Sequence, residues 1–157
     1  MNILILCTAN SARSILLEAL LNTLGAGRFQ VYSAGSQPAG KVHPQSLKLL
    51  QDKGYPVDQV RSKSWDEFAG AEAVPMDLVI TVCASAAGET CPIWPGAPLR
   101  AHWGIPDPTE AAQPDWEEAF EVAYQALHRR AEAFVALSAE QDKAHYATLL
   151  KEIGEMI

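Results

Sequence analysis

Three short segments of the chain have the apolar pattern of β-strands. Residues 2–6 form a largely apolar run that leads into Cys7, as expected of a central parallel strand buried on both faces. Residues 29–33 alternate like a second strand, and residues 77–82 form a third, which leads into Cys83. The pattern therefore predicts a sheet in which two strands end at a cysteine.

Between and after these strands, apolar residues recur three and four positions apart, as on one face of a helix. The predicted helices cover residues 14–24, 44–53, 115–137 and the part of the chain after 138, with one short helical turn at 65–68. Asp115 with Glu118, and Ser138 with Gln141, form the capping-box pattern that opens a helix. The proline-rich stretch 84–109 is predicted to be a loop.

Strands that alternate with helices indicate an α/β fold with a parallel sheet and helices on both faces. In such sheets, ligands bind at the carboxyl ends of the strands. Cys7 and Cys83 both follow such an end, so the topology predicts that they share one functional edge.

Composition narrows the class of function. The length of 157 residues suits one domain, and the apolar opening is too short for a membrane span and lacks a signal-peptide pattern, so we expect a cytoplasmic protein without membrane contact. A net charge of −7 argues against a nucleic-acid partner. It also disfavours anions at long range, but salt screens that field within roughly 8 Å. Three cysteines in a reducing compartment are either inert core residues or reactive thiols.

Residues 7–13 form a Cys-x5-Arg loop between a strand and a helix. Inward backbone amides and the helix dipole would bind an anion there, and the same field favours the thiolate of Cys7. Arg13 can donate two hydrogen bonds to a tetrahedral oxyanion, and Ser14 can donate to the thiolate. The alternative is a buried cysteine with a surface arginine. The predicted substrate-binding residues are Thr8, Ala9, Asn10, Ser11, Ala12, Arg13 and Ser14.

Three further residues are candidates for the chemistry. Expulsion of an oxygen requires an acid nearby, and Asp107 lies between two prolines, although Asp-Pro also commonly starts a turn. Cys83 and Cys91 would lie about 12 Å apart if the segment between them were helical, whereas a disulfide needs roughly 4.4–6.8 Å. A disulfide between them therefore requires this segment to bend or unwind. The scattered histidines and cysteines do not have the spacing of a zinc site.

Together these residues resemble the arsenate reductases built on the low-molecular-weight protein tyrosine phosphatase fold. The matching pieces are residues 7–14, 32–35, 81–83, 91–92, 102–104 and 107–108. The resemblance implies a three-layer α/β sandwich with a four-stranded parallel sheet flanked by helices. It covers residues 1–137, the predicted reductase domain, and leaves residues 138–157 as a C-terminal helical extension.

The resemblance also implies a mechanism. Cys7 attacks arsenate held by the loop and Arg13, while Asp107 protonates the departing oxygen. Cys83 then attacks the sulfur of Cys7 and arsenite leaves. Cys91 moves the disulfide outward to Cys83–Cys91, where thioredoxin or a glutathione–glutaredoxin system reduces it. We expect a monomer without a tightly bound cofactor, which uses an external thiol reductant.

The chain departs from the family pattern at several positions. Ala9 replaces an expected glycine, Ala12 replaces a cysteine that many relatives carry, and the Cys83–Cys91 interval is one residue longer than in the best-known members. Some relatives bind potassium beside the loop, which would carry over to Asn10, Ser33 and Ser62. Ser64, next to Lys63, replaces the aspartate expected in that group, which disfavours the cation site; no other metal is expected.

Two other functions remain open from the sequence. A phosphotyrosine phosphatase would use only Cys7, Arg13 and Asp107. Phosphatases of this fold usually carry aromatic residues near the Asp-Pro; Trp103 is close here, but no tyrosine pair is visible. A non-enzymatic redox or oxyanion sensor would use the last helix to contact a partner. The sequence does not decide between the two reductants.

Overall fold

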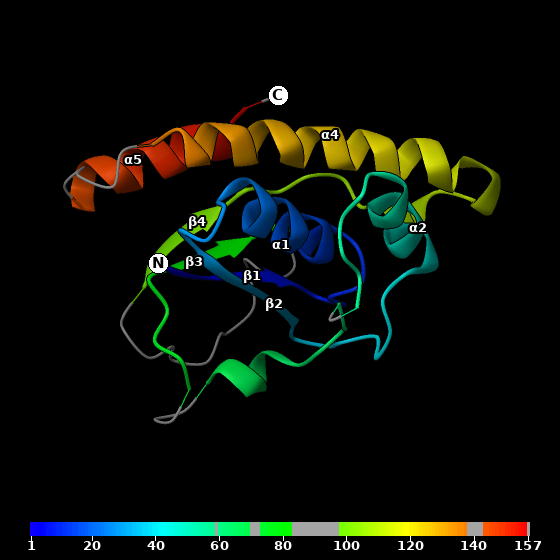
Figure 1. The fold of residues 1–157 in the computed structure, drawn as a ribbon, viewed down its shortest axis with the longest axis horizontal. Helices are drawn as coiled ribbons and strands as arrows, with labels where there is room; N and C mark the ends of the chain where they lie inside the picture. Colours follow the sequence, from blue (N-terminus) through cyan, green and yellow to red (C-terminus); the bar gives the residue numbers. More distant parts are fainter. Residues whose placement is uncertain (59, 70–72, 83–97, 138–142, 157) are drawn as a thin grey trace.

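A sheet of four parallel strands forms the centre of the computed structural model, which describes residues 1–58, 60–69, 73–82, 98–137 and 143–156 (Figure 1). The strand order is β2–β1–β3–β4. The strands are β1 (Asn2–Cys7), β2 (Gln30–Gly35), β3 (Leu78–Thr81) and β4 (Leu99–His102). The predicted α/β fold with a four-stranded parallel sheet and flanking helices is confirmed.

The apolar run of the first strand has a direct structural cause. β1 lies between β2 and β3, and the side chains from Ile3 to Leu6 are fully buried. Burial of each such side chain contributes about 1.5–3 kcal/mol to folding. Because Cys7 is paired with Gly35 and Leu6 with Thr81, the carboxyl ends of three strands meet at one edge of the sheet.

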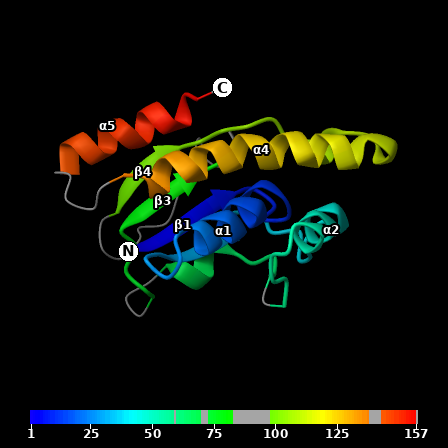
Figure 2. The same ribbon diagram turned by 45° about the horizontal axis from the view of Figure 1, so that its top comes forward.

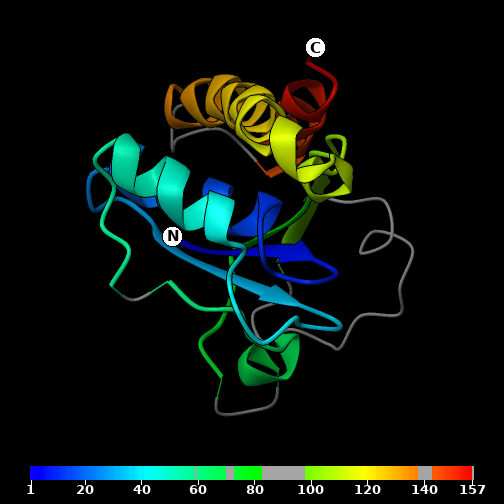
Figure 3. The ribbon, with the colours of Figure 1, turned by 90° about the vertical axis from the view of Figure 1, so that its right-hand side faces the viewer.

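The helices divide unequally between the two faces of the sheet. On one face lie α1 (Arg13–Leu24), α4 (Trp116–Val135) and α5 (Lys143–Gly154), with α2 (Pro44–Asp52) packed against α4 (Figure 3). The opposite face carries the 3-10 helix η1 (Trp65–Phe68), whose Phe68 ring packs against Tyr32 of β2 at 5.4 Å. The predicted helical turn at 65–68 is therefore confirmed.

Two predictions for the second half of the chain are wrong. β4 lies within the stretch 84–109 that was predicted to be a loop. It is an edge strand of four residues with exposed Arg100 and His102, which is too short to give a clear period. The Asp115 side chain makes no capping hydrogen bond, because the 3-10 helices η2 (Pro108–Glu110) and η3 (Gln113–Asp115) lead directly into α4.

The C-terminal helix packs on the rest of the molecule. α5 lies beside α4 over β4 (Figure 2), and Tyr146, Leu150 and Ile153 belong to the same apolar core as the sheet. The buried Trp103 ring donates a hydrogen bond from Nε1 to the Leu150 carbonyl at 3.1 Å. The proposed cap at Ser138 and Gln141 lies outside the described residues. Among the residues that are described, no helix has the length and apolar character needed to span a membrane.

Candidate active site

The loop after β1 turns its carbonyl groups outward. The Thr8 carbonyl accepts a hydrogen bond from the Gln37 N–H at 2.9 Å, and the Ala9 carbonyl accepts one from the Ala39 N–H at 3.0 Å. The Ser62 hydroxyl donates a second bond to Ala9 at 3.1 Å. The segment after β2 therefore braces the first half of the loop from outside.

The second half of the loop is held from α2. The Ser11 carbonyl accepts hydrogen bonds from the His43 N–H at 3.0 Å and from the Ser46 hydroxyl at 2.8 Å, and Ser46 is fully buried. The Ala12 carbonyl accepts the Leu16 N–H at 2.9 Å, which begins the hydrogen bonding of α1. Because these four carbonyls are bonded to other parts of the chain, we infer that the loop N–H groups face its interior, as in an anion-binding nest.

The side chain of Asn10 connects the loop to α1 and to the segment around Lys63. Its backbone is left-handed at φ 49°, a conformation that asparagine tolerates better than most residues. Its buried side chain donates from Nδ2 to the Ser14 hydroxyl at 2.8 Å, and its Oδ1 accepts the Lys63 N–H at 3.0 Å. Because Ser14 accepts this bond, its own hydroxyl proton remains available as a donor. The predicted bond from Ser14 to the Cys7 thiolate stays a prediction.

Gly35 allows the loop to lie against β2. A Cβ at this position would stand 2.3 Å from the Thr8 carbonyl oxygen and 3.1 Å from the Asn10 nitrogen. Both are backbone atoms of the loop, so no side-chain rotation could relieve the conflict. Only a residue without a side chain fits at this position, and this explains the glycine at the end of β2.

Cys7 is the last residue of β1 and is 5% exposed. It stands at the loop that leads into the N-terminus of α1, where the positive end of the helix dipole favours a thiolate over a thiol. The position therefore suits a nucleophile that attacks an anion bound in the loop.

Arg13 and Asp107 meet at the same edge. Arg13 Nη1 donates to the Ile105 carbonyl at 3.0 Å, and Nη2 lies 3.4 Å from Asp107 Oδ2. The buried Nε of Arg13 has no hydrogen-bond partner among the described residues, which leaves it a donor for an oxyanion. Asp107 also caps η2 by accepting from Thr109 N at 2.9 Å. Asp107 therefore has both features considered from the sequence: it starts a turn, and it lies beside Arg13 in the site.

The structure describes only part of the predicted relay. β3 ends at Thr81, and the next residue, Val82, donates its N–H to the Leu6 carbonyl at 3.0 Å. The chain therefore runs beside the end of β1 up to the residue before Cys83. Cys83 and Cys91 themselves lie outside the described residues, so their part in the relay stays a prediction.

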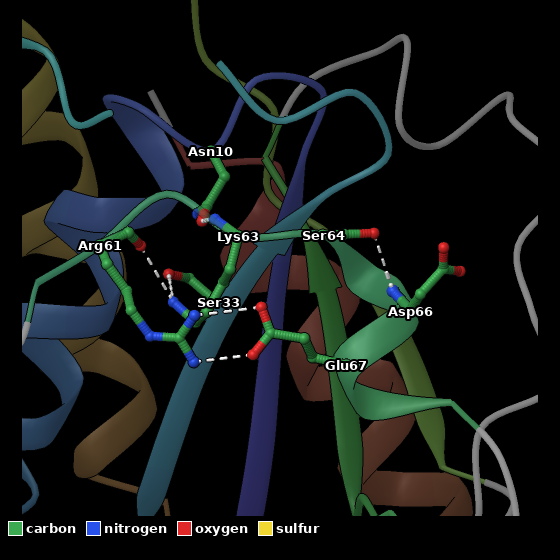
Figure 4. A network of polar contacts seen from close by, with 7 residues as sticks. All are labelled: Asn10, Ser33, Arg61, Lys63, Ser64, Asp66 and Glu67. Atoms are coloured by element: carbon green, nitrogen blue, oxygen red, sulfur yellow. Dashed lines mark hydrogen bonds and ion pairs between the residues drawn. The ribbon is translucent and has the colours of Figure 1, made fainter. Parts of the chain in front are cut away.

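The potassium site that the sequence already disfavoured, at Asn10, Ser33 and Ser62, lies beside the side chain of Lys63. Ser33 Oγ donates to Glu18 Oε2 at 2.7 Å, Ser62 Oγ donates to Ala9, and Asn10 Oδ1 accepts from the Lys63 backbone. The Lys63 Nζ lies 3.5 Å from Ser33 Oγ, so a positive charge already stands at this place (Figure 4). A potassium ion at this place would be repelled by that ammonium.

The opposite charges of Lys63 and Glu18 partly offset the energetic cost of burying each group. Burial raises the pKa of Glu18, and the charge of Lys63 lowers it. Burial lowers the pKa of Lys63, and the charge of Glu18 raises it. Each group is therefore the chief compensation for the desolvation of the other. Sequence reasoning missed the structural roles of Glu18, Lys63, His43 and Ser46. Of these, only Glu18 carried a local signal, as a charged residue within the apolar run of residues 15–21.

The fold and the loop define the class of protein: a parallel α/β sheet whose first strand delivers a cysteine to an anion-binding nest closed by an arginine. Residues 2–145 match the family described as low molecular weight phosphotyrosine protein phosphatase, and the chain belongs to this family.

Several named relatives are arsenate reductases. The one from Halalkalibacterium halodurans is 35% identical over 113 residues, which cover 72% of this chain and 78% of that protein. A solved structure described as an arsenate reductase in the phosphate binding state is 26% identical, with a TM-score of 0.69, and covers 86% of this chain and 96% of its own. The thioredoxin-dependent arsenate reductase of Corynebacterium glutamicum is 25% identical, with a TM-score of 0.57, over 80% of this chain and 57% of its own.

Proposed function

We propose that the protein reduces arsenate to arsenite at Cys7. The observation that carries this proposal is the loop itself, in which outward carbonyls leave the N–H groups and the unpartnered Nε of Arg13 to bind a tetrahedral oxyanion beside a nucleophilic sulfur. Curated relatives named arsenate reductase support the choice of arsenate, because this chain retains three cysteines as well as the loop.

In the first step, the Cys7 thiolate attacks the arsenic atom and a sulfur–arsenic bond forms. One arsenate oxygen leaves as water after Asp107 supplies a proton. Arg13 holds the remaining oxygens through charge-assisted hydrogen bonds. The position of Asp107 against Arg13 supports this role, because both side chains then face the same oxyanion.

In the second step, the Cys83 thiolate attacks the sulfur of Cys7. The sulfur–arsenic bond breaks, its electron pair reduces As(V) to As(III), and arsenite departs from a Cys7–Cys83 disulfide. Cys91 then attacks Cys83, which releases the Cys7 thiolate and forms a Cys83–Cys91 disulfide.

Thioredoxin is the proposed reductant of that disulfide. The likeness to a thioredoxin-dependent arsenate reductase supports it over glutathione with glutaredoxin. The electrons then come from an external thiol, so no tightly bound cofactor is needed. The working unit is proposed to be a cytoplasmic monomer, since reducing conditions keep thiols free there and one chain supplies every catalytic residue.

The test is NADPH oxidation in the presence of arsenate, thioredoxin and thioredoxin reductase. Wild type should consume NADPH with arsenate, and Cys91→Ser should complete one turnover and stop at the Cys7–Cys83 disulfide. Mass spectrometry after one turnover without reductant should find a Cys83–Cys91 bond in wild type. Unchanged steady-state turnover in Cys91→Ser would rule out the outward relay, and a glutathione adduct formed on addition of glutathione would indicate the other reductant.

A phosphotyrosine phosphatase is the second candidate, because the family bears that activity in its name and two aromatic rings in contact, those of His43 and Trp116, belong to residues near the loop. The His43 ring, whose backbone holds Ser11, lies 4.5 Å from the Trp116 ring. A phosphatase would need Cys7, Arg13 and Asp107 alone. Cys83→Ser should therefore retain hydrolysis of p-nitrophenyl phosphate if this is the function, and lose arsenate turnover if reduction is.

A further inference from the structure

A buried network behind the anion-binding loop contains a charge that the proposed mechanism does not use. Lys63 is 8% exposed, and its Nζ donates to the Arg61 carbonyl at 3.2 Å and to Ser33 Oγ at 3.5 Å. Ser33 is fully buried, and its hydroxyl donates a hydrogen bond to Glu18 Oε2 at 2.7 Å. The hydroxyl of Ser33, on β2, thus connects the ammonium of Lys63 to the carboxylate of Glu18, on α1.

The backbone of the same lysine holds the loop. The Lys63 N–H donates to Asn10 Oδ1, and its carbonyl accepts the Gly35 N–H at 2.9 Å. By bonding the carbonyl of Arg61, two residues earlier, the ammonium also closes the turn from which the Lys63 N–H projects. Loss of the ammonium would therefore loosen the turn that fixes Asn10, and Asn10 in turn holds Ser14.

The polar side chains of Arg61 and Ser64, near Lys63 in the sequence, have hydrogen-bond partners of their own. The Arg61 guanidinium pairs with Glu67 through two hydrogen bonds of 3.0 and 2.7 Å. Ser64 points away from Lys63 and accepts the Asp66 N–H at 3.1 Å, as the cap of η1 (Figure 4). Among the described residues of this network, Lys63 is thus the main cation that offsets the charge of Glu18 behind an anion site, and Arg61 makes a smaller contribution.

We propose that the Lys63 ammonium is the structural cation of the anion-binding loop, so that oxyanion binding here requires no metal ion from solution. Lys63 is a positioning residue: it acts through Asn10 and Ser14 and touches neither substrate nor sulfur. The inference rests on the proposed function only in taking the loop as an oxyanion site.

The test compares the full chain in potassium chloride and in tetramethylammonium chloride at equal ionic strength, because the larger cation cannot enter the network. Calorimetric titration with inorganic phosphate gives a Kd, thermal melting gives Tm, and arsenate kinetics give KM and kcat. Wild type and Lys63→Arg should show the same phosphate Kd and Tm in both salts. The exposed-lysine variant Lys48→Ala, which removes an ion pair on α2, is the matched control and should behave like wild type.

Lys63→Ala leaves Glu18 and two oxygen acceptors without their ammonium. In tetramethylammonium chloride, its phosphate Kd and arsenate KM should rise about tenfold, as misplacement of a binding group by a fraction of an ångström does, with kcat at saturation little changed. Potassium chloride should recover part of that loss and raise its Tm, because a small cation can enter the space that the side chain vacates.

Two outcomes would overturn the proposal. One is a wild type whose phosphate affinity or Tm rises in potassium over tetramethylammonium, a result that needs no variant to fold. The other is a folded Lys63→Ala that binds phosphate as wild type does in both salts. Phosphate binding without arsenate turnover in wild type would refute the reductase function and leave this inference standing.

Discussion

Replacement of Gly35 by alanine should separate loop geometry from general stability. The added Cβ would stand 2.3 Å from the Thr8 carbonyl oxygen, whereas real Cβ contacts essentially never fall below 3.0 Å, so loop and strand must part by about 0.7 Å. Overpacking of this kind costs about 1–3 kcal/mol of folding free energy. A shift of that size at the anion-binding loop should lower kcat/KM for arsenate by about 100-fold.

The chain offers a matched control for this variant. A Cβ at Gly154, the last residue of α5, would stand at the same 2.3 Å from a backbone oxygen, that of His102. Gly154→Ala should therefore lower Tm by a comparable amount and leave kcat/KM of the folded enzyme close to the wild-type value. Steady-state kinetics with arsenate, together with thermal melting of both variants, provide the comparison. Equal loss of kcat/KM in both variants, or full activity in Gly35→Ala, would refute the argument from loop geometry.

Three further changes test other parts of the structure. Arg13→Lys should raise the arsenate KM about 10- to 100-fold, because lysine cannot donate a forked pair of hydrogen bonds; an unchanged KM in steady-state assays would contradict this. Burial lowers the pKa of His43, so its contribution to stability is present above its ordinary value of 6.5 and is lost as the pH falls through the lowered value. The fall in Tm from pH 7.5 to 5.5 should therefore be smaller in His43→Asn, which retains an N-cap residue, and an equal fall would count against the role of His43. Leu150→Ala, at a fully buried position of α5, should lower the unfolding free energy in urea by about 2–5 kcal/mol, and a loss below about 1 kcal/mol would mean that α5 is dispensable for packing.

The parts of the site that sequence reasoning found are contiguous or carry their own local signal. Cys7 and Arg13 belong to one loop between a buried strand and a helix, and Asp107 lies between two prolines. The strand–helix alternation likewise placed the ends of β1 and β3 together, since parallel strands share one functional edge.

The parts that it missed depend on tertiary contacts. His43 and Ser46 reach Ser11 only because α2 packs against the loop, across 32 and 35 positions of sequence. Nothing in the letters around Ser46 distinguishes a buried serine that braces a loop from one that faces water. β4 was missed for a different reason: a strand of only four residues in a proline-rich stretch has too few alternating positions to be told from a loop.

The potassium site of some relatives, which the sequence disfavoured here, shows that matching residues alone do not indicate a bound ion. The charge that the place requires is the better guide. Asn10 and Ser33 are present in this chain, yet their oxygens bond the Lys63 backbone and Glu18. What the fold requires at this place is a positive charge beside a buried carboxylate, because an uncompensated Glu18 would oppose an anion in the loop next to it. The chain meets that requirement with a covalently attached ammonium, which cannot dissociate at low ionic strength. The same reasoning explains how a protein with a net charge of −7 can be built to bind an oxyanion. The distant negative charges are screened by salt within roughly 8 Å, whereas the loop amides and Arg13 act at contact distance.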